Sequence, residues 1–243
     1  MSDLSVQLYS VREAFDADPV GTLARLKDIG FEQVELFGFV DLEDRYAEAL
    51  AATGLVAPSG HNGLVGVDDA VGVLEAAARL GVTTVIEPGV REGWETADGV
   101  TAIARSLSEL APVAAEYGLV LGYHNHWWEF ADIDGRSALE VFAAQVDPRV
   151  VLQVDTYWSA VAGLDTPALL RRLGDRVRLI HVKDGPVEED PSTQLPAGEG
   201  AVDVAAILTA APLAAHVIEF DEYAGDIFEG IATSYRYLTS RVA

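Results

Sequence analysis

The sequence predicts a (β/α)₈ barrel, and two observations carry that prediction. Short apolar stretches rich in β-branched and aromatic residues alternate with segments of helical spacing, and this alternation occurs eight times. Such alternation is typical of parallel strands joined by right-handed helical crossovers. An open doubly wound sheet would alternate in the same way, but eight units in 243 residues fit a closed barrel better. No linker-like stretch interrupts the chain, so we expect residues 1–243 to form a single (β/α)₈ barrel domain.

The expected strands are apolar runs bounded by Gly, Pro or Asp. In chain order they cover residues 4–10, 33–39, 55–61, 83–89, 119–126, 150–158, 177–184 and 214–223. The intervening helices carry start and stop signals: the first begins at Asp18-Pro19 and ends at Gly30, and three later ones end at Gly54, Gly81 and Gly118. The one long irregular segment, 185–203, follows the seventh strand, so we expect it over the barrel mouth.

Composition excludes several classes of function. The formal net charge of −23 argues against a surface for nucleic acid or anionic lipid, which needs clustered Lys and Arg. There is no cysteine, so a metal would have to be bound by oxygen and imidazole. No apolar run of about eighteen residues is present, and the start of the chain has no leader pattern. We therefore expect a cytoplasmic protein with no membrane and no nucleic-acid partner, and a homo-oligomer is left open.

Three polar side chains end three successive expected strands. They are Asp155, His181 and Glu219, and each follows an apolar run in which a lone charge would be costly to bury. Because the carboxyl ends of barrel strands meet at one mouth, the three should converge on one point. Carboxylates with an imidazole suit Mn²⁺ first, with Co²⁺, Mg²⁺ or Zn²⁺ as alternatives. The alternative interpretation is that the carboxylates cap helices or pair with arginines.

The fifth strand offers several candidates for a fourth ligand. The segment HNHWWEF contains His124, His126 and Glu129, and the two histidines project to the same face of the strand. Glu129 lies beyond the strand and has to fold back to reach the centre. Either Glu129 or His124 could be the ligand, and charge matching favours Glu129. His124 or His126 would then be free to move protons or to bind a substrate oxygen.

Other residues at the strand ends are candidates for substrate contact. We expect five side chains to bind substrate: His61, Glu87, His126, Lys183 and Trp158. Arg12 and Glu35 should lie at the mouth on the first two strands, where they can pair with each other. His216, early in the last strand and out of phase with Glu219, is interpreted as structural.

The chain resembles the sugar isomerase/epimerase superfamily with the xylose isomerase-like barrel. The resemblance is carried by VQLYSVRE (6–13), VELFGF (34–39), HNHWWEF (124–130), VDTYW (154–158), HVKD (181–184), GEG (198–200) and IEFDEY (218–223). It implies one divalent cation held by a Glu, Asp, His, Glu set, which maps onto Glu129, Asp155, His181 and Glu219. The sequence departs from many relatives by having His124 where they have Glu. The DNA-cleaving branch needs more histidines, and here Trp158 stands where that branch has another.

These observations lead to one main hypothesis and two alternatives. The main hypothesis is a divalent-metal-dependent isomerase or epimerase of an unphosphorylated keto-sugar or related polyol, acting through an enediolate. Glu129 and Glu219 would be the acid and base, and His124 would serve as the acid if a leaving group is expelled. The first alternative is a keto-inositol (inosose) dehydratase or 3-keto-glycoside lyase on the same scaffold. The second is a non-catalytic sugar-binding or partner-subunit barrel.

Overall fold

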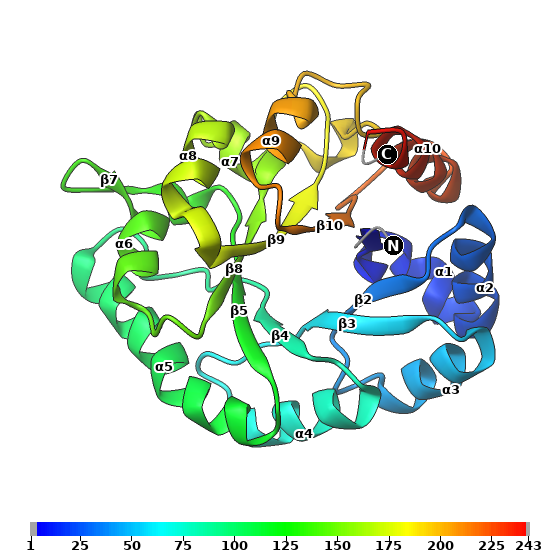
Figure 1. Cartoon of the computed structure of the whole chain (residues 1–243), viewed down its shortest axis with the longest axis horizontal. Helices are drawn as coiled ribbons and strands as arrows, with labels where there is room; N and C mark the ends of the chain where they lie inside the picture. Colours follow the sequence, from blue (N-terminus) through cyan, green and yellow to red (C-terminus); the bar gives the residue numbers. More distant parts are fainter. Residues whose placement is uncertain (1–3, 242–243) are drawn as a thin grey trace.

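Eight parallel strands form a nearly closed barrel in the computed structural model, which describes residues 4–241 (Figure 1). Around the sheet the strands follow the order β1-β10-β9-β8-β5-β4-β3-β2. Their bounds are β1 Leu4–Val6, β2 Gln33–Phe37, β3 Val56–His61, β4 Thr84–Glu87, β5 Val120–His124, β8 Val151–Asp155, β9 Val177–Val182 and β10 Ala215–Ile218. A single parallel bridge between Gln7 and Glu35 joins the first and last strands of this order, which brings the sheet round on itself. The prediction of a (β/α)₈ barrel is confirmed.

Helices surround the barrel and cover its outer face (Figure 1). The α-helices are α1 Arg12–Ala17, α2 Pro19–Ile29, α3 Glu43–Thr53, α4 Ala70–Leu80, α5 Ala97–Glu116, α6 Ala138–Gln145, α7 Thr156–Val161, α8 Thr166–Leu173, α9 Val204–Ala210 and α10 Ile227–Thr239. Short 3₁₀ turns are η1 Leu8–Val11, η2 Trp128–Phe130, η3 Gly174–Arg176 and η4 Pro191–Thr193, and a small hairpin joins β6 Asp132–Ile133 to β7 Arg136–Ser137. Near the seam between β1 and β2, α10 packs beside α2.

The helix signals in the sequence act as expected. Asp18 accepts a hydrogen bond from Gly21 N at the start of α2, with Pro19 in its first turn. Gly54 and Gly81 end α3 and α4 in the left-handed conformation, where a side chain would be strained. Local sequence therefore sets the lengths of these helices.

Every predicted strand is present, but each is shorter than predicted. At β8 the carboxylate of Asp155 accepts hydrogen bonds from Tyr157 N and Trp158 N. These bonds make Asp155 the N-cap of α7, so the prediction that Tyr157 and Trp158 continue the strand is wrong. At the first strand, η1 begins at Leu8 for a similar reason, since the Gln7 side chain accepts from Tyr9 N.

Two layers fill the barrel interior. An apolar layer of Ile86, Leu179 and Val217 packs inside the barrel. Val217 of β10 pairs in register with His181 of β9, and His181 lies two residues beyond Leu179. Because side chains alternate along a strand, the next inward residues after Leu179 and Val217 are His181 and Glu219. The polar residues of the mouth therefore rest on an apolar floor.

The irregular segment 185–203 is held against the barrel in part by the carboxylate of Asp184. Asp184 accepts hydrogen bonds from the backbone N–H groups of Gly185, Gly198 and Val202. A side chain at Gly200 would collide with this carboxylate, which explains a glycine there. The segment that was expected over the mouth is thus anchored rather than loose.

Among residues 4–241, no helix combines the length and the apolar content needed to cross a bilayer.

Candidate metal centre

Four side chains meet inside the barrel at the carboxyl ends of the strands. His124 ends β5, Asp155 ends β8, His181 lies on β9, and Glu219 directly follows β10. One ligand atom from each lies within 4.8 Å of the others, and all four residues are buried. Because metal–ligand bonds of about 2.0–2.2 Å allow two ligands of one ion to be at most about 4.4 Å apart, this spacing needs little adjustment. The group fits a divalent metal ion.

The fourth member of this group is His124, not Glu129. Glu129 is fully buried, and its carboxylate accepts hydrogen bonds from Tyr123 Oη at 3.0 Å and from His126 N at 2.8 Å. The turn η2 directs it to these partners. Of the four ligands mapped from the family pattern, the structure therefore brings together Asp155, His181 and Glu219. His124 takes the position in this group that was predicted for Glu129.

A buried lysine also contacts the carboxylates of this group. Lys183 Nζ lies 2.7 Å from Glu219 Oε2, 2.7 Å from Asp221 Oδ2 and 2.9 Å from Asp155 Oδ2. Burial alone would lower the pKa of Lys183, but these carboxylates raise it well above its ordinary value, so the side chain is an ammonium. Asp155 Oδ2 is buried, and its charge is balanced by the Lys183 ammonium at 2.9 Å. A buried carboxylate oxygen beside other donors is a candidate ligand for a cation.

The two histidines of the group differ in charge. Burial opposes the charged form of His181, but the carboxylates of Glu219 and Glu35 raise its pKa to about 10. For His124, burial and the positive charge of neighbouring histidines lower the pKa well below its ordinary value. His124 is therefore neutral near pH 7, which is the form that binds a metal.

Glu35 is a buried carboxylate that lies next to this group, and its partner is not the one predicted from the sequence. Its Oε1 lies 2.6 Å from His181 Nε2, and its Oε2 accepts hydrogen bonds from Ser59 Oγ and Gln153 Nε2. Arg12 instead donates to the backbone oxygens of Tyr9 and Asp221, so the expected pairing of Arg12 with Glu35 is wrong. Glu35 thus faces the interior of the barrel.

A cavity of about 390 Å³ opens above the group. It is lined by Tyr9, Phe37, Gly38, Asp41, His61, Asn62, Gly63, Pro88, His124, His126, Glu219 and Asp221. This volume suits a small polar molecule, and the rings of Tyr9 and Phe37 supply apolar surface. Two members of the metal group, His124 and Glu219, reach its floor.

The structure divides the predicted substrate contacts into two sets. His61 and His126 line the cavity, whereas Glu87, Lys183 and Trp158 do not. Glu87 accepts hydrogen bonds from Leu64 N and Val65 N, so it holds the turn after β3. Lys183 is buried against the carboxylates of Asp155 and Glu219, and Trp158 is also buried.

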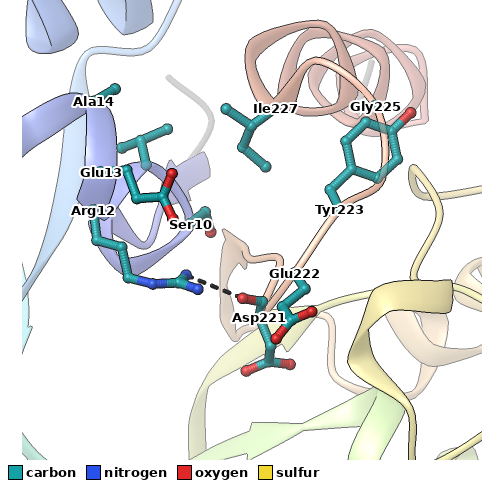
Figure 2. A pocket seen from close by; sticks show the side chains of 10 residues that line it. Ser10, Arg12, Glu13, Ala14, Asp221, Glu222, Tyr223, Gly225 and Ile227 are labelled. Atoms are coloured by element: carbon teal, nitrogen blue, oxygen red, sulfur yellow. Dashed lines mark hydrogen bonds between the residues drawn. The ribbon is translucent and has the colours of Figure 1, made fainter.

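A second cavity of about 480 Å³ lies on the other side of Arg12 (Figure 2). Figure 2 shows the guanidinium of Arg12 donating to the backbone oxygen of Asp221, with Glu13 and Glu222 nearby. Asp221 lines both cavities. Arg12 therefore ties the segment after β1 to the segment after β10 at the barrel mouth.

Comparison with known proteins agrees with this geometry. Residues 23–211, more than half of the chain, match the family described as xylose isomerase-like TIM barrel. The chain belongs to this family. An inosose dehydratase from Lactiplantibacillus plantarum is 35% identical over 83 residues, which are 34% of this chain and 27% of that protein.

Solved structures share the fold along the whole chain. A sugar phosphate isomerase/epimerase from Parabacteroides distasonis has a TM-score of 0.84 and 21% identity, covering 99% of this chain and 93% of that one. The IolI protein with a binding zinc atom has a TM-score of 0.71 and 16% identity, covering 100% of this chain and 98% of that one. At these identities the likeness establishes the fold.

Proposed function

We propose that this chain is a divalent-metal-dependent isomerase or epimerase of an unphosphorylated keto-sugar or related polyol. The observation that carries the proposal is the group His124, Asp155, His181 and Glu219 at the base of an open polar cavity. The fold of this chain is shared by a sugar phosphate isomerase/epimerase, which supports this class of reaction. Lining residues of the cavity include no Lys or Arg, so nothing there matches a phosphate group.

The proposed ligands are Nε2 of His124, Oδ2 of Asp155, Nδ1 of His181 and Oε2 of Glu219, and a cation bound there would displace the proton that His181 carries without metal. A mixed set of nitrogen and oxygen donors favours a transition metal over Mg²⁺, so Mn²⁺, Co²⁺ and Zn²⁺ are the proposed ions. The zinc atom of the IolI protein supports this choice. When bound, the cation supplies a Lewis acid that stabilises negative charge on a substrate oxygen.

Glu219 is the proposed proton-transfer residue. It is the one carboxylate of the group that also lines the cavity, so it can reach a substrate carbon next to a carbonyl. Burial would raise its pKa, but Lys183 and His181 hold that pKa well below its ordinary value. It is therefore ionised and can take a proton. Lys183, 2.7 Å from Oε2 of Glu219, keeps that carboxylate in place, and His61 and His126 are proposed to bind substrate hydroxyls.

A dehydratase is the second candidate, and the match to an inosose dehydratase favours it. Removal of the same proton would then be followed by loss of a hydroxyl group β to the carbonyl, which leaves as water. Both reactions begin with the same exchangeable proton. They differ in the mass of the product.

Solvent exchange tests the proposal directly. The metal-loaded protein is incubated in D₂O with ketoses, inososes and 3-keto-glycosides, and deuterium uptake and product mass are recorded. We expect uptake at the carbon next to the carbonyl in at least one substrate, with a product of unchanged mass apart from deuterium. Loss of one water would select the dehydratase, and no uptake from any of these classes would contradict both candidates.

A substitution at Glu219 tests whether this residue is the base that removes the substrate proton. Glu219→Gln should reduce deuterium uptake by at least about 10²-fold, the low end of what a general base contributes. Circular dichroism should show the fold unchanged. Glu222→Gln, an acidic residue of the second cavity, is the matched control and should exchange at the normal rate. Near-normal uptake by Glu219→Gln would remove Glu219 from this role.

A further inference from the structure

We propose that Gln153 is a positioning residue that fixes which ring nitrogen of His124 carries the proton, so that Nε2 faces the metal donors. Gln153 lies on β8, two residues before Asp155, and is fully buried. It contacts His61, His124 and Glu35 at once. The metal-binding consequence rests on the function proposed above, whereas the tautomer can be observed with or without a metal.

Glu35 determines how the amide of Gln153 is oriented. Gln153 Nε2 lies 2.7 Å from Oε2 of Glu35, which can only accept when it is ionised. Ser59 Oγ donates to the same oxygen at 2.6 Å, and Gln7 Nε2 donates to Oε1 at 2.9 Å, so the Glu35 carboxylate is surrounded by donors. The opposite orientation of the amide would place two acceptor oxygens in contact. The amide nitrogen of Gln153 therefore faces Glu35, and its oxygen faces the histidines.

The oxygen of Gln153 in turn determines the tautomers of two histidines. Oε1 lies 3.0 Å from Nδ1 of His124 and 2.6 Å from Nε2 of His61, and an amide oxygen can only accept. Both of these ring nitrogens must then carry a proton. In neutral His124 the other nitrogen, Nε2, has none, and it lies 3.8 Å from Asp155 Oδ2. That is the form a metal ligand requires.

The other ligand histidine is oriented by the same carboxylate. His181 Nε2 lies 2.6 Å from Oε1 of Glu35, while Nδ1 lies 2.6 Å from Oε2 of Glu219. Glu35 thus holds His181 directly and His124 through Gln153. Ser59 and Gln7 donate to the remaining positions on Glu35, so this buried carboxylate has partners on both oxygens.

The first test needs no substitution. The protein is labelled with ¹⁵N-histidine, stripped of metal with a chelator, and examined by long-range ¹H–¹⁵N NMR at neutral pH. His124 is assigned by its loss in His124→Asn. We expect His124 to carry its proton on Nδ1. A proton on Nε2 would overturn the proposal, whether or not the protein binds metal.

The second test measures affinity. Gln153→Met removes both the donor and the acceptor at similar size, and we expect Zn²⁺ affinity, measured by competition with a chromophoric chelator, to fall about 10–100-fold. Gln145→Met is the control, because Gln145 at the end of α6 bonds Thr101 of α5 and contacts no residue of the metal group. It should bind Zn²⁺ like the unaltered protein.

The outcomes separate the two proposals. Equal Zn²⁺ affinity for Gln153→Met and the unaltered protein would overturn the role of Gln153. If the unaltered protein binds no Zn²⁺, Mn²⁺ or Co²⁺, the proposed function fails, and the NMR experiment still decides the tautomer of His124.

Discussion

The two layers of the barrel interior are built on the same strands but are stabilised in different ways. The lower layer of Ile86, Leu179 and Val217 is apolar, and its burial is favourable without any partner. The upper layer contains His181 and Glu219, two residues further along the strands, where burial is costly unless charges are paired. Folding therefore depends on side-chain shape in the lower layer and on balanced charge in the upper one.

Removal of two ligands should have the largest effect on the upper layer. Asp155→Asn combined with His181→Ala should abolish stoichiometric metal binding, since half of the proposed donors are lost. Elemental analysis of the folded fraction measures this. Asp226→Asn changes an Asp that likewise caps a helix, at α10 and away from the group, and should retain full metal content. One bound ion per chain in the double variant would show that the metal lies elsewhere.

Loss of the Lys183 ammonium should make the stability of the folded protein depend on bound metal. Lys183→Met leaves Asp155 and Glu219 without their nearest cation, which should cost about 3–5 kcal/mol in metal-free protein. Mn²⁺ at about 100 times its dissociation constant should return about 2.7 kcal/mol, because it binds only the folded state. Thermal unfolding with and without Mn²⁺ measures both values. A variant as stable as the unaltered protein without metal would contradict this account of charge balance.

A cavity created by substitution in the lower layer should lower stability without changing metal affinity. Leu179→Ala should lower the free energy of unfolding by about 2–5 kcal/mol, through lost burial and an unfilled space. Urea unfolding measures the loss, and metal addition should not selectively rescue it. A large fall in metal affinity for this variant would show that the two layers are not independent.

The smallest change is expected at Glu129. Glu129→Gln alters an acceptor of bonds from Tyr123 and His126 N, so it should cost about 1–3 kcal/mol of stability. Metal content should stay unchanged, because Glu129 lies outside the donor group. Elemental analysis decides this. Loss of the ion in Glu129→Gln would restore Glu129 as a ligand and place His124 outside the centre.

Sequence was sufficient for the fold because its signals are local. Strand runs alternate with helices that end at glycines such as Gly54 and Gly81, and these signals act within a few residues. Asp155, His181 and Glu219 could also be grouped, because barrel topology brings strand ends together wherever they lie in the chain. The missed detail at Tyr157 and Trp158 arose because Asp155 is both a group member and a helix cap.

The fourth ligand and the network beneath it could not be predicted in the same way. Glu129 was favoured on charge, but the turn η2 directs its carboxylate to Tyr123. Glu35 and Gln153 meet from strands 118 residues apart in the sequence. Their periodicity shows that each faces inward, but the height at which they meet depends on strand register. The VELFGF segment was a signal that Glu35 matters, without showing for what.

The anchoring of segment 185–203 has a practical consequence for protein engineering. Several contacts fasten this segment, among them the bonds from its backbone amides to Asp184 and those between Gln194 and Asp221. Asp221 in turn pairs with Lys183, so the contact of Gln194 with Asp221 connects the segment to the buried charges of the metal group. Anyone exchanging this segment between barrels to alter specificity should transplant Gln194 and the glycines at 198 and 200 with it. A graft without them would disturb the interior it was meant to cover.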